Sequence, residues 1–170
     1  KDFPEKFDTI TLKNVSFSYP LSEENILEDV NLVIPSGKTT ALLGATGCGK
    51  STLLKLITRF YDSEGEILFG DTEIKDISLD SLRSNISFVL QKSELFTGTI
   101  SENIKQGKEN ATQEEIEAAS KIAQAHDFIS SFTNGYETFV AEKGASLSGG
   151  QKQRISIARG LIKKPKILIF

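Results

Sequence analysis

The most informative segment of the chain reads Gly44-Ala45-Thr46-Gly47-Cys48-Gly49-Lys50-Ser51. It fits the pattern G-x-x-x-x-G-K-[ST], the phosphate-binding loop known as Walker A. A polyphosphate needs many closely spaced donors, and the glycines let backbone N–H groups turn inward without obstructing side chains. A helix beginning near Lys50 adds the positive end of its dipole. The segment therefore predicts a polyphosphate site.

Each residue of this loop has an expected role. Lys50 should bridge the β- and γ-phosphates, and the Ser51 hydroxyl should be a ligand of Mg²⁺. The alternative is a glycine-rich turn between a strand and a helix that binds nothing. We expect the following residues to contact the nucleotide: Gly44, Ala45, Thr46, Gly47, Cys48, Gly49, Lys50, Ser51 and Thr52.

The sequence on both sides of the loop supplies the context that a Walker A requires. Thr39–Leu43 is short and apolar on both faces, which predicts a buried parallel strand. Lys50–Phe60 repeats apolar residues at helical spacing, which predicts a helix. The expected order is thus strand, glycine loop, helix, and this order favours the phosphate site over the plain turn.

The remaining pattern indicates an α/β chain. Apolar and polar residues alternate in the first part, with a break at Lys13-Asn14, and predict strands around Ile10–Leu12, Val15–Tyr19 and Val30–Ile34. Further short strands are expected at 66–69, 86–90 and 167–170, and short or longer helices at 79–84, within 98–132 and at 151–164. Thr112 begins a capping box with Glu115.

Composition narrows the class of protein. The 170 residues carry 20 basic and 23 acidic side chains, a net charge of −3, with 38% hydrophobic residues. This balance argues against a disordered chain and against a strongly basic nucleic-acid binder. One Cys and one His exclude an internal disulfide and a Cys/His zinc cage. No window approaches the ~18 apolar residues of a membrane span, and the absence of Met suggests an excerpt of a longer polypeptide.

A second glycine-containing segment, Leu147-Ser148-Gly149-Gly150-Gln151, precedes a predicted helix. It offers a hydroxyl, two amides without side chains and a helix N-terminus, which together suit an anion. The alternative is an ordinary helix start with Ser148 as the N-cap. The pentapeptide resembles the signature motif of ATP-binding cassette (ABC) proteins, in which two cassettes pair head to tail. The resemblance implies that Ser148, Gly149, Gly150 and Gln151 contact the ATP held by the Walker A of the partner cassette.

Other segments resemble landmarks of the same family. Tyr19 is similar to the aromatic residue on which adenine stacks, although it could also be a third apolar residue on the Val15–Phe17 face. Gln91 resembles the Q-loop glutamine, which implies contacts with Mg²⁺ and the attacking water. Thr138–Gly144 looks like the exporter-type X-loop, with departures at Phe139, Ala141 and Lys143, and Arg59-Phe-Tyr-Asp62 is similar to exporter cassettes.

The resemblance implies a P-loop NTPase fold of the RecA-like class: a parallel sheet, an antiparallel N-terminal β layer and an α-helical insert. We expect residues 1–91 plus 156–170 to form the ATP-binding core and 92–155 the insert. The implied cofactors are ATP and Mg²⁺, and the implied catalytic residues are Lys50 and Gln91. The implied partners are a second cassette and a transmembrane domain on the same or an associated chain. The expected location is the cytoplasmic face of a membrane, and the expected activity is ATP hydrolysis that drives export.

The given sequence stops at Phe170, before the Asp and Glu that the family places after Walker B, and without the last strands, the D-loop or the switch histidine. We therefore expect this 170-residue piece alone to hydrolyse ATP negligibly. His126, the only histidine, precedes the signature and is expected to be an ordinary helix-surface residue.

Two alternatives remain open. The first is a soluble ABC-type ATPase that acts on nucleic acid or the ribosome, because 143–170 contains no acidic residue and seven basic ones, Lys143, Lys152, Arg154, Arg159, Lys163, Lys164 and Lys166. The X-loop resemblance and the missing aromatic platform favour the transporter, with no nucleic-acid partner. The second is a P-loop kinase, which would have no role for Leu147–Gln151.

Overall fold

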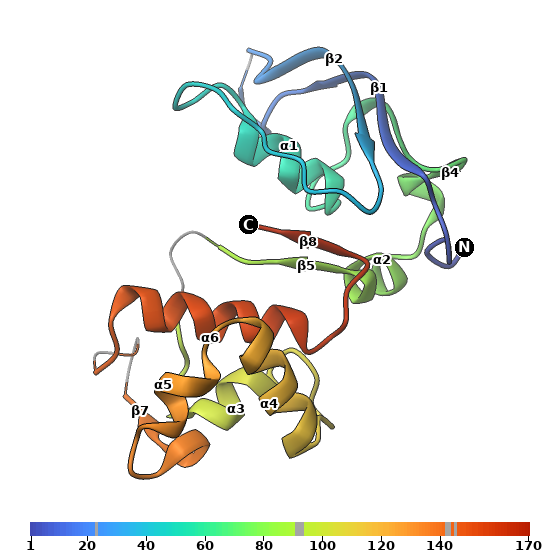
Figure 1. The fold of residues 1–170 in the computed structure, drawn as a ribbon. Coiled ribbons are helices and arrows are strands. Elements are labelled where there is room, and N and C mark those ends of the chain that lie inside the picture. The colour runs from blue at the N-terminus through green and yellow to red at the C-terminus, as the bar shows by residue number, and fades with distance from the viewer. Residues whose placement is uncertain (23, 91–93, 142–143, 145) are drawn as a thin grey trace. The chain divides into compact units, whose positions relative to one another are not determined.

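A computed structural model describes residues 1–22, 24–90, 94–141, 144 and 146–170. The chain divides into two compact units (Figure 1), Lys1–Arg83, here the N-terminal unit, and Ser84–Phe170, here the C-terminal unit. The helix α2 (Leu79–Asn85) contains the boundary between them.

The N-terminal unit is built on an antiparallel sheet (Figure 1). Its central strands are β1 (Thr9–Phe17) and β3 (Glu64–Phe69), flanked by β2 (Leu27–Pro35) and β4 (Thr72–Glu73) in the order β2-β1-β3-β4. Every pair in this sheet is antiparallel. The predicted antiparallel layer is therefore present, and the period-two alternation located its first strands correctly.

A β-bulge in β1 explains why the alternation breaks at Lys13-Asn14. Leu12 and Val15 are both buried, although they are separated by an odd number of positions, which would place them on opposite faces of a regular strand. The register of β1 shifts between these two residues against β2 and between Lys13 and Ser16 against β3, and Asn14 has a φ of 50°. The extra residue returns the second half of the strand to the same face, so that one strand replaces the two that the sequence suggested.

The expected strand at Thr39–Leu43 is wrong. The segment is an irregular loop in the structure, and Leu43 is 92% exposed. None of the ladders among the described residues includes this segment. A strand without a ladder partner leaves its backbone N–H and C=O groups unpaired, so its apolar composition alone does not make it a strand. The predicted helix does follow the loop, as α1 (Lys50–Ile57), and ends before Phe60.

Short elements complete the N-terminal unit. A 3₁₀ turn, η1 (Ile74–Asp76), follows β4. Three aromatic rings, those of Phe3, Phe7 and Phe69, contact one another with centroids 5.0–5.7 Å apart. These contacts hold the N-terminal segment on the sheet, together with the ion pair of Lys1 and Asp76 at 2.7 Å.

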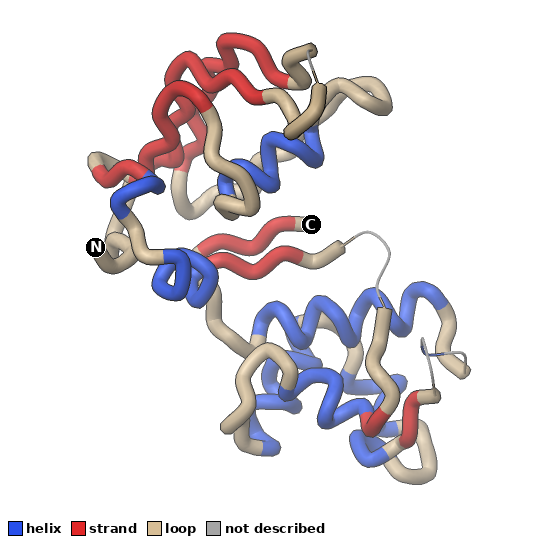
Figure 2. The backbone as a smooth tube through the Cα atoms, turned by 180° about the vertical axis from the view of Figure 1, so that it is seen from behind, coloured by secondary structure: helices blue, strands red, loops and turns tan. Residues whose placement is uncertain are grey.

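The C-terminal unit is mainly helical (Figures 1 and 2), as the sequence indicated. It contains α3 (Ile100–Lys105), α4 (Gln113–Ile122), α5 (His126–Ser130) and α6 (Gly149–Leu161). The capping box predicted at the start of α4 is formed. The helices share one core, whose fully buried members include Ile100, Ile104, Ile116, Ile129, Ile155 and Ala158.

Two short pairs of strands belong to the same unit. β5 (Ile86–Phe88) and β8 (Ile167–Ile169) are parallel and lie side by side (Figure 1). β6 (Gly98–Thr99) and β7 (Phe139–Val140) are antiparallel, and the 3₁₀ turn η2 (Gly135–Glu137) precedes β7. The parallel pair agrees with the parallel sheet that the resemblance implied.

Ile122, at the end of α4, is 70% exposed and lies off the buried face of the helix, about 100° around it from Ala123. The expectation for His126 needs correction. His126 is half-buried at the start of α5, and its Nδ1 lies 2.9 Å from the Tyr136 hydroxyl. His126 therefore joins α5 to η2 by a side-chain hydrogen bond and is not simply a solvated surface residue.

No helix in the described part of the chain combines the length and the apolar composition required to cross a bilayer.

The bulge in β1 makes a glycine necessary on β3, and this can be tested by substitution. Gly65 has a φ of 76°, and a Cβ there would overlap the carbonyl oxygens of Lys13 and Asn14. Gly65→Ala should therefore destabilise the protein by the left-handed backbone cost of ~1–2 kcal/mol plus an overlap cost of ~1–3 kcal/mol. Urea unfolding of the purified protein measures the change.

Gly37→Ala is the matched control, because Gly37 has a similar φ of 70° but open space around the position of a Cβ. It should show only the backbone cost of ~1–2 kcal/mol. Equal destabilisation by the two substitutions would mean that the bulge does not press on Gly65.

Candidate functional site

The Walker A segment forms a loop that closes around the ammonium group of Lys50. The Nζ atom donates hydrogen bonds to the carbonyl oxygens of Gly44, at 2.8 Å, and of Ala45, at 2.7 Å. It also lies 3.5 Å from Sγ of Cys48. The Cys48 N–H in turn donates to the Ala45 carbonyl at 3.3 Å. A positive charge is thus held at the loop by neutral acceptors, which suits the approach of an anion.

Gly49 joins this loop to the helix, and a residue with a Cβ would not fit at this position. It is the N-cap of α1, with a φ of 90°. A Cβ on Gly49 would also approach Leu27 Cδ2 to 2.6 Å. No acidic residue lies in the first turn of α1, so the N–H groups and the dipole of the helix are not neutralised by a carboxylate of that turn.

Tyr19 lies beside α1. Its hydroxyl is hydrogen-bonded to that of Thr52 at 3.1 Å. Its ring contacts those of Phe17, at a centroid distance of 5.0 Å, and Tyr61, at 5.3 Å, and the Nζ of Lys55 lies 5.7 Å from its centre. Tyr19 is only half-buried, which leaves part of the ring open to a planar ligand. The sequence did not reveal the bond to Thr52, since nothing in the spacing connects the two residues.

The second predicted segment begins α6. Ser148 is the N-cap, and a complete capping box joins it to Gln151. The Ser148 N–H donates to Oε1 of Gln151 at 2.9 Å, and the Gln151 N–H donates to Oγ of Ser148 at 3.2 Å. The Ser148 hydroxyl therefore accepts one bond and keeps its proton as a donor. A Cβ on Gly149 or Gly150 would meet nothing within 4 Å, so their amides are approachable.

The predicted residues thus fall into two groups. The Walker A residues and Tyr19 belong to the N-terminal unit, where contacts with α1 bring them together. Ser148, Gly149, Gly150 and Gln151 belong to the C-terminal unit. Gln91 lies outside the described residues, as do Glu142 and Lys143 of the predicted X-loop.

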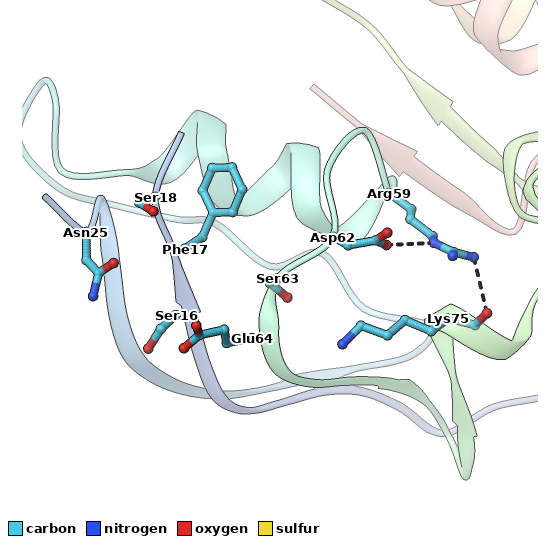
Figure 3. Close-up of a pocket in the computed structure, with 9 residues that line it drawn as sticks. All are labelled: Ser16, Phe17, Ser18, Asn25, Arg59, Asp62, Ser63, Glu64 and Lys75. Carbon is cyan, nitrogen blue, oxygen red and sulfur yellow. Dashed lines mark hydrogen bonds and ion pairs between the residues drawn. The ribbon is translucent and has the colours of Figure 1, made fainter. Parts of the chain in front are cut away.

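A pocket of about 420 Å³ lies elsewhere in the N-terminal unit (Figure 3). It is lined by residues outside the predicted nucleotide-binding set: Ser16, Phe17, Ser18, Asn25, Arg59, Asp62, Ser63, Glu64 and Lys75. Arg59 donates to Asp62 at 3.0 Å and to three backbone carbonyls, including that of Lys75. Its charge already has partners, and the pocket also contains two carboxylates. This chemistry does not suit a phosphate.

The donors available for a metal ion are few. Among the described residues, no group of three or more His, Cys, Asp or Glu side chains could hold a metal ion. Ser51 is exposed in the first turn of α1 and is the hydroxyl expected for Mg²⁺. This donor set fits an ion that obtains most of its ligands from phosphate oxygens and water, as Mg²⁺ commonly does in nucleotide sites.

Comparison with known proteins gives a consistent result. The family model described as ABC transporter matches residues 27–170. The chain is 54% identical over 162 residues to the Bacillus subtilis "Putative multidrug export ATP-binding/permease protein YgaD" and 48% identical over 172 residues to the Caenorhabditis elegans "Multidrug resistance protein pgp-1". A solved structure of a bacterial Atm1-family ABC exporter with ATP bound has a TM-score of 0.91 at 40% identity.

These relatives are longer than the chain. The matched parts cover 95% and 100% of this chain but 28% of the Bacillus protein and 13% of the Caenorhabditis protein. The solved exporter is covered to 30%, against 98% of this chain. The P-loop NTPase fold expected from the sequence is confirmed by these matches.

The position of Cys48 predicts protection of its thiol by nucleotide. Cys48 is exposed and is the only cysteine of the 170 residues. At an ATP concentration about ten times the Kd, alkylation of this thiol should slow roughly tenfold, because the occupied loop excludes the reagent. Mass spectrometry of the labelled peptide measures the rate. Cys48→Ser gives the background, and equal rates with and without ATP would contradict the prediction.

Two substitutions separate the ring of Tyr19 from its hydroxyl. Tyr19→Phe removes the bond to Thr52 but keeps the aromatic face, so ATP affinity should change less than about twofold. Tyr19→Leu removes the stacking surface and should weaken ATP binding roughly tenfold, within the range of base–aromatic stacking. Titration of a fluorescent ATP analogue measures both. A greater loss in Tyr19→Phe than in Tyr19→Leu would assign the role to the hydroxyl.

Proposed function

This chain belongs to the ABC transporter family, and from that membership we propose that it is the ATP-binding domain of an exporter. The observation that carries the proposal is the position of Lys50 Nζ, held by Gly44 and Ala45 carbonyls at the N-terminal end of α1. Triphosphate oxygens replace these carbonyls as stronger, charged acceptors. The family resemblance and the exporter names of the relatives support the choice of ATP and of export.

The Walker A residues act on the phosphates by charge and position. Backbone N–H groups of the loop and of the first turn of α1 donate to the β- and γ-phosphates, and Lys50 neutralises charge that develops during transfer. Ser51, with Gln91, would hold Mg²⁺, which would supply further neutralisation of the phosphate charge. Gln91 orients the attacking water, and Tyr19 stacks on the adenine. Lys50 and Gln91 are therefore the proposed catalytic residues.

The α6 segment acts on a second molecule of ATP. We assign Ser148, Gly149, Gly150 and Gln151 to the γ-phosphate bound by the Walker A of a partner cassette. The exposed Ser148 hydroxyl, the unobstructed glycine amides and the absence of acidic residues from the first turn of α6 support this role. ATP then joins two cassettes head to tail, and hydrolysis allows them to separate.

The two cassettes transmit this cycle to transmembrane segments on the same or an associated chain, at the cytoplasmic face of a membrane. The names of the relatives, which include an export permease and a multidrug resistance protein, support a membrane partner. By role, residues 1–91 plus 156–170 form the nucleotide-binding core and 92–155 the helical insert. The pairing of β5 with β8 supports placing these distant segments in one sheet.

The basic segment near the C-terminus does not favour the nucleic-acid alternative. Arg159 is turned inward, with its guanidinium bound to Asn103 and to the Glu94 carbonyl. Arg154 donates to the Gln124 carbonyl. These two charges serve contacts inside the C-terminal unit and do not form a continuous surface for phosphates.

Two substitutions in the full-length transporter test the two roles separately. Lys50→Ala removes the positive charge that neutralises the transferred phosphate, and it should lower the rate of ATP hydrolysis roughly a hundredfold or more. Ser148→Arg should leave ATP affinity within about twofold while preventing ATP-driven association of the cassettes, because its bulk and charge enter the assigned contact. Phosphate release measures hydrolysis, equilibrium nucleotide titration measures ATP affinity, and cross-linking between the cassettes measures their association.

Ser148→Ala is the control for Ser148→Arg, since it removes the hydroxyl without adding bulk and should cost only the helix cap, about 1 kcal/mol. Association of the cassettes should then weaken less than in Ser148→Arg. If the Ser148→Arg protein still associates in ATP like the unaltered protein, the role assigned to α6 is wrong.

A further inference from the structure

The side chain of Arg159 connects α6 to a segment far away in the sequence. Arg159 lies in the last turn of α6. Its Nε donates to the Asn103 carbonyl at 2.9 Å and its Nη2 to Asn103 Oδ1 at 3.1 Å. Its Nη1 donates to the Glu94 carbonyl at 3.4 Å, and the guanidinium carbon lies 5.2 Å from the centre of the Phe96 ring. One side chain therefore contacts α3 and the segment 94–96 together.

Asn103 completes this connection from α3. Its side chain is 1% exposed. The Oδ1 atom accepts from the Phe96 N–H at 2.8 Å, and Nδ2 donates to the Phe96 carbonyl at 2.8 Å and to the Thr99 carbonyl at 3.0 Å. Asn103 thus pairs with the backbone of Phe96 on both its N–H and its C=O, as a neighbouring strand would.

Two successive side chains of the segment 94–96 point to opposite sides, one into the core and one outward. Leu95 is buried in the core of the C-terminal unit, with 3% exposure. The side chain of Phe96 is directed outward and is 60% exposed, while its backbone is held by Asn103 and one face of its ring by Arg159. The exposed ring therefore does not stabilise the segment by burial, and the polar contacts of Arg159 and Asn103 hold the segment together with the buried side chain of Leu95.

The contacts of the Arg159 guanidinium are with neutral acceptors. No ion pair joins it to any carboxylate of the described residues, and burial lowers the pKa of its guanidinium. Its acceptors are two backbone carbonyls and one amide oxygen. A planar guanidinium can serve all three at fixed angles, whereas an ammonium group cannot. The arrangement therefore depends on geometry more than on charge.

We propose that Arg159 and Asn103 are positioning residues that bind the segment Glu94–Thr99 to α6. A displacement of α6, whose N-terminus carries Ser148, is then passed to this segment and to the exposed Phe96. The proposal rests on the assigned contact of Ser148 with ATP, because that contact is what displaces α6. Neither residue touches the nucleotide, and their role is to make the two parts of the C-terminal unit move together.

Hydrogen-exchange mass spectrometry of the full-length transporter tests this role. In the unaltered protein, a non-hydrolysable ATP analogue should slow amide exchange both at 148–155 and at 94–99, roughly tenfold where a local opening is suppressed. In Arg159→Lys, which keeps the charge but loses the planar fork, protection at 148–155 should remain. Protection at 94–99 should fall to less than about twofold.

Arg154→Lys is the matched control on the same helix, since among the described residues Arg154 makes a single hydrogen bond, to the Gln124 carbonyl at 3.3 Å. It should retain protection at both segments. Asn103→Asp is the second variant, because it keeps the acceptor for Arg159 but loses both donations to Phe96 and Thr99. It should also lose protection at 94–99 alone, which preserves the test if Arg159→Lys does not fold.

The possible outcomes are distinct. The proposal is overturned if a folded Arg159→Lys or Asn103→Asp protein keeps the same protection at 94–99 as Arg154→Lys. It is also overturned if these variants lose protection at both segments while still binding the analogue, which would indicate general damage to α6. If the unaltered protein shows no protection at 148–155, the assigned role of Ser148 fails first, and the proposed coupling fails with it.

Discussion

The first turns of α1 and α6 carry backbone N–H groups that have no hydrogen-bond acceptor among the carbonyls of their own helix. Every helix has this property, but the chain treats these two starts differently from those of α3 and α4. The capping boxes of α3 and α4 place the charged Glu102 and Glu115 in the first turn, whereas the capping box of α6 uses the neutral Gln151. Neither α1 nor α6 has an acidic residue in its first turn. The N-cap of α1 is Gly49, and that of α6 is Ser148, which is followed by Gly149. Both keep the positive end of the helix available to an anion.

Local chemistry explains which parts of the fold and site the sequence could reveal. The Walker A glycines, the Ser148 cap and the alternation in β1 and β2 each depend on residues close in sequence, and each could be interpreted without coordinates. Thr39–Leu43 could not, since whether an apolar run becomes a strand depends on a partner strand that the run does not encode. The bond between Tyr19 and Thr52 and the contacts of Arg159 were also missed, because they join residues distant in the chain.

Arg59 and Arg159 show a common use of half-buried cations in the two units. Each guanidinium donates to backbone carbonyls of segments other than its own, and Arg59 adds one carboxylate, that of Asp62. Backbone acceptors are present whatever the side chain, so such a contact fixes the path of the chain more than it recognises particular residues. The surrounding sequence can therefore vary while the path is maintained, and the arginine itself cannot be exchanged for lysine without loss of geometry.

The bulge of β1 links two positions that are distant in the chain. The additional residue at Lys13-Asn14 brings two carbonyl oxygens so close to Gly65 that no side chain fits there. A shorter β1 with regular alternation from Leu12 onward would keep its apolar face and would no longer need glycine on β3. During divergence, a residue other than glycine at position 65 should therefore be found only in sequences whose first strand has also lost this additional residue.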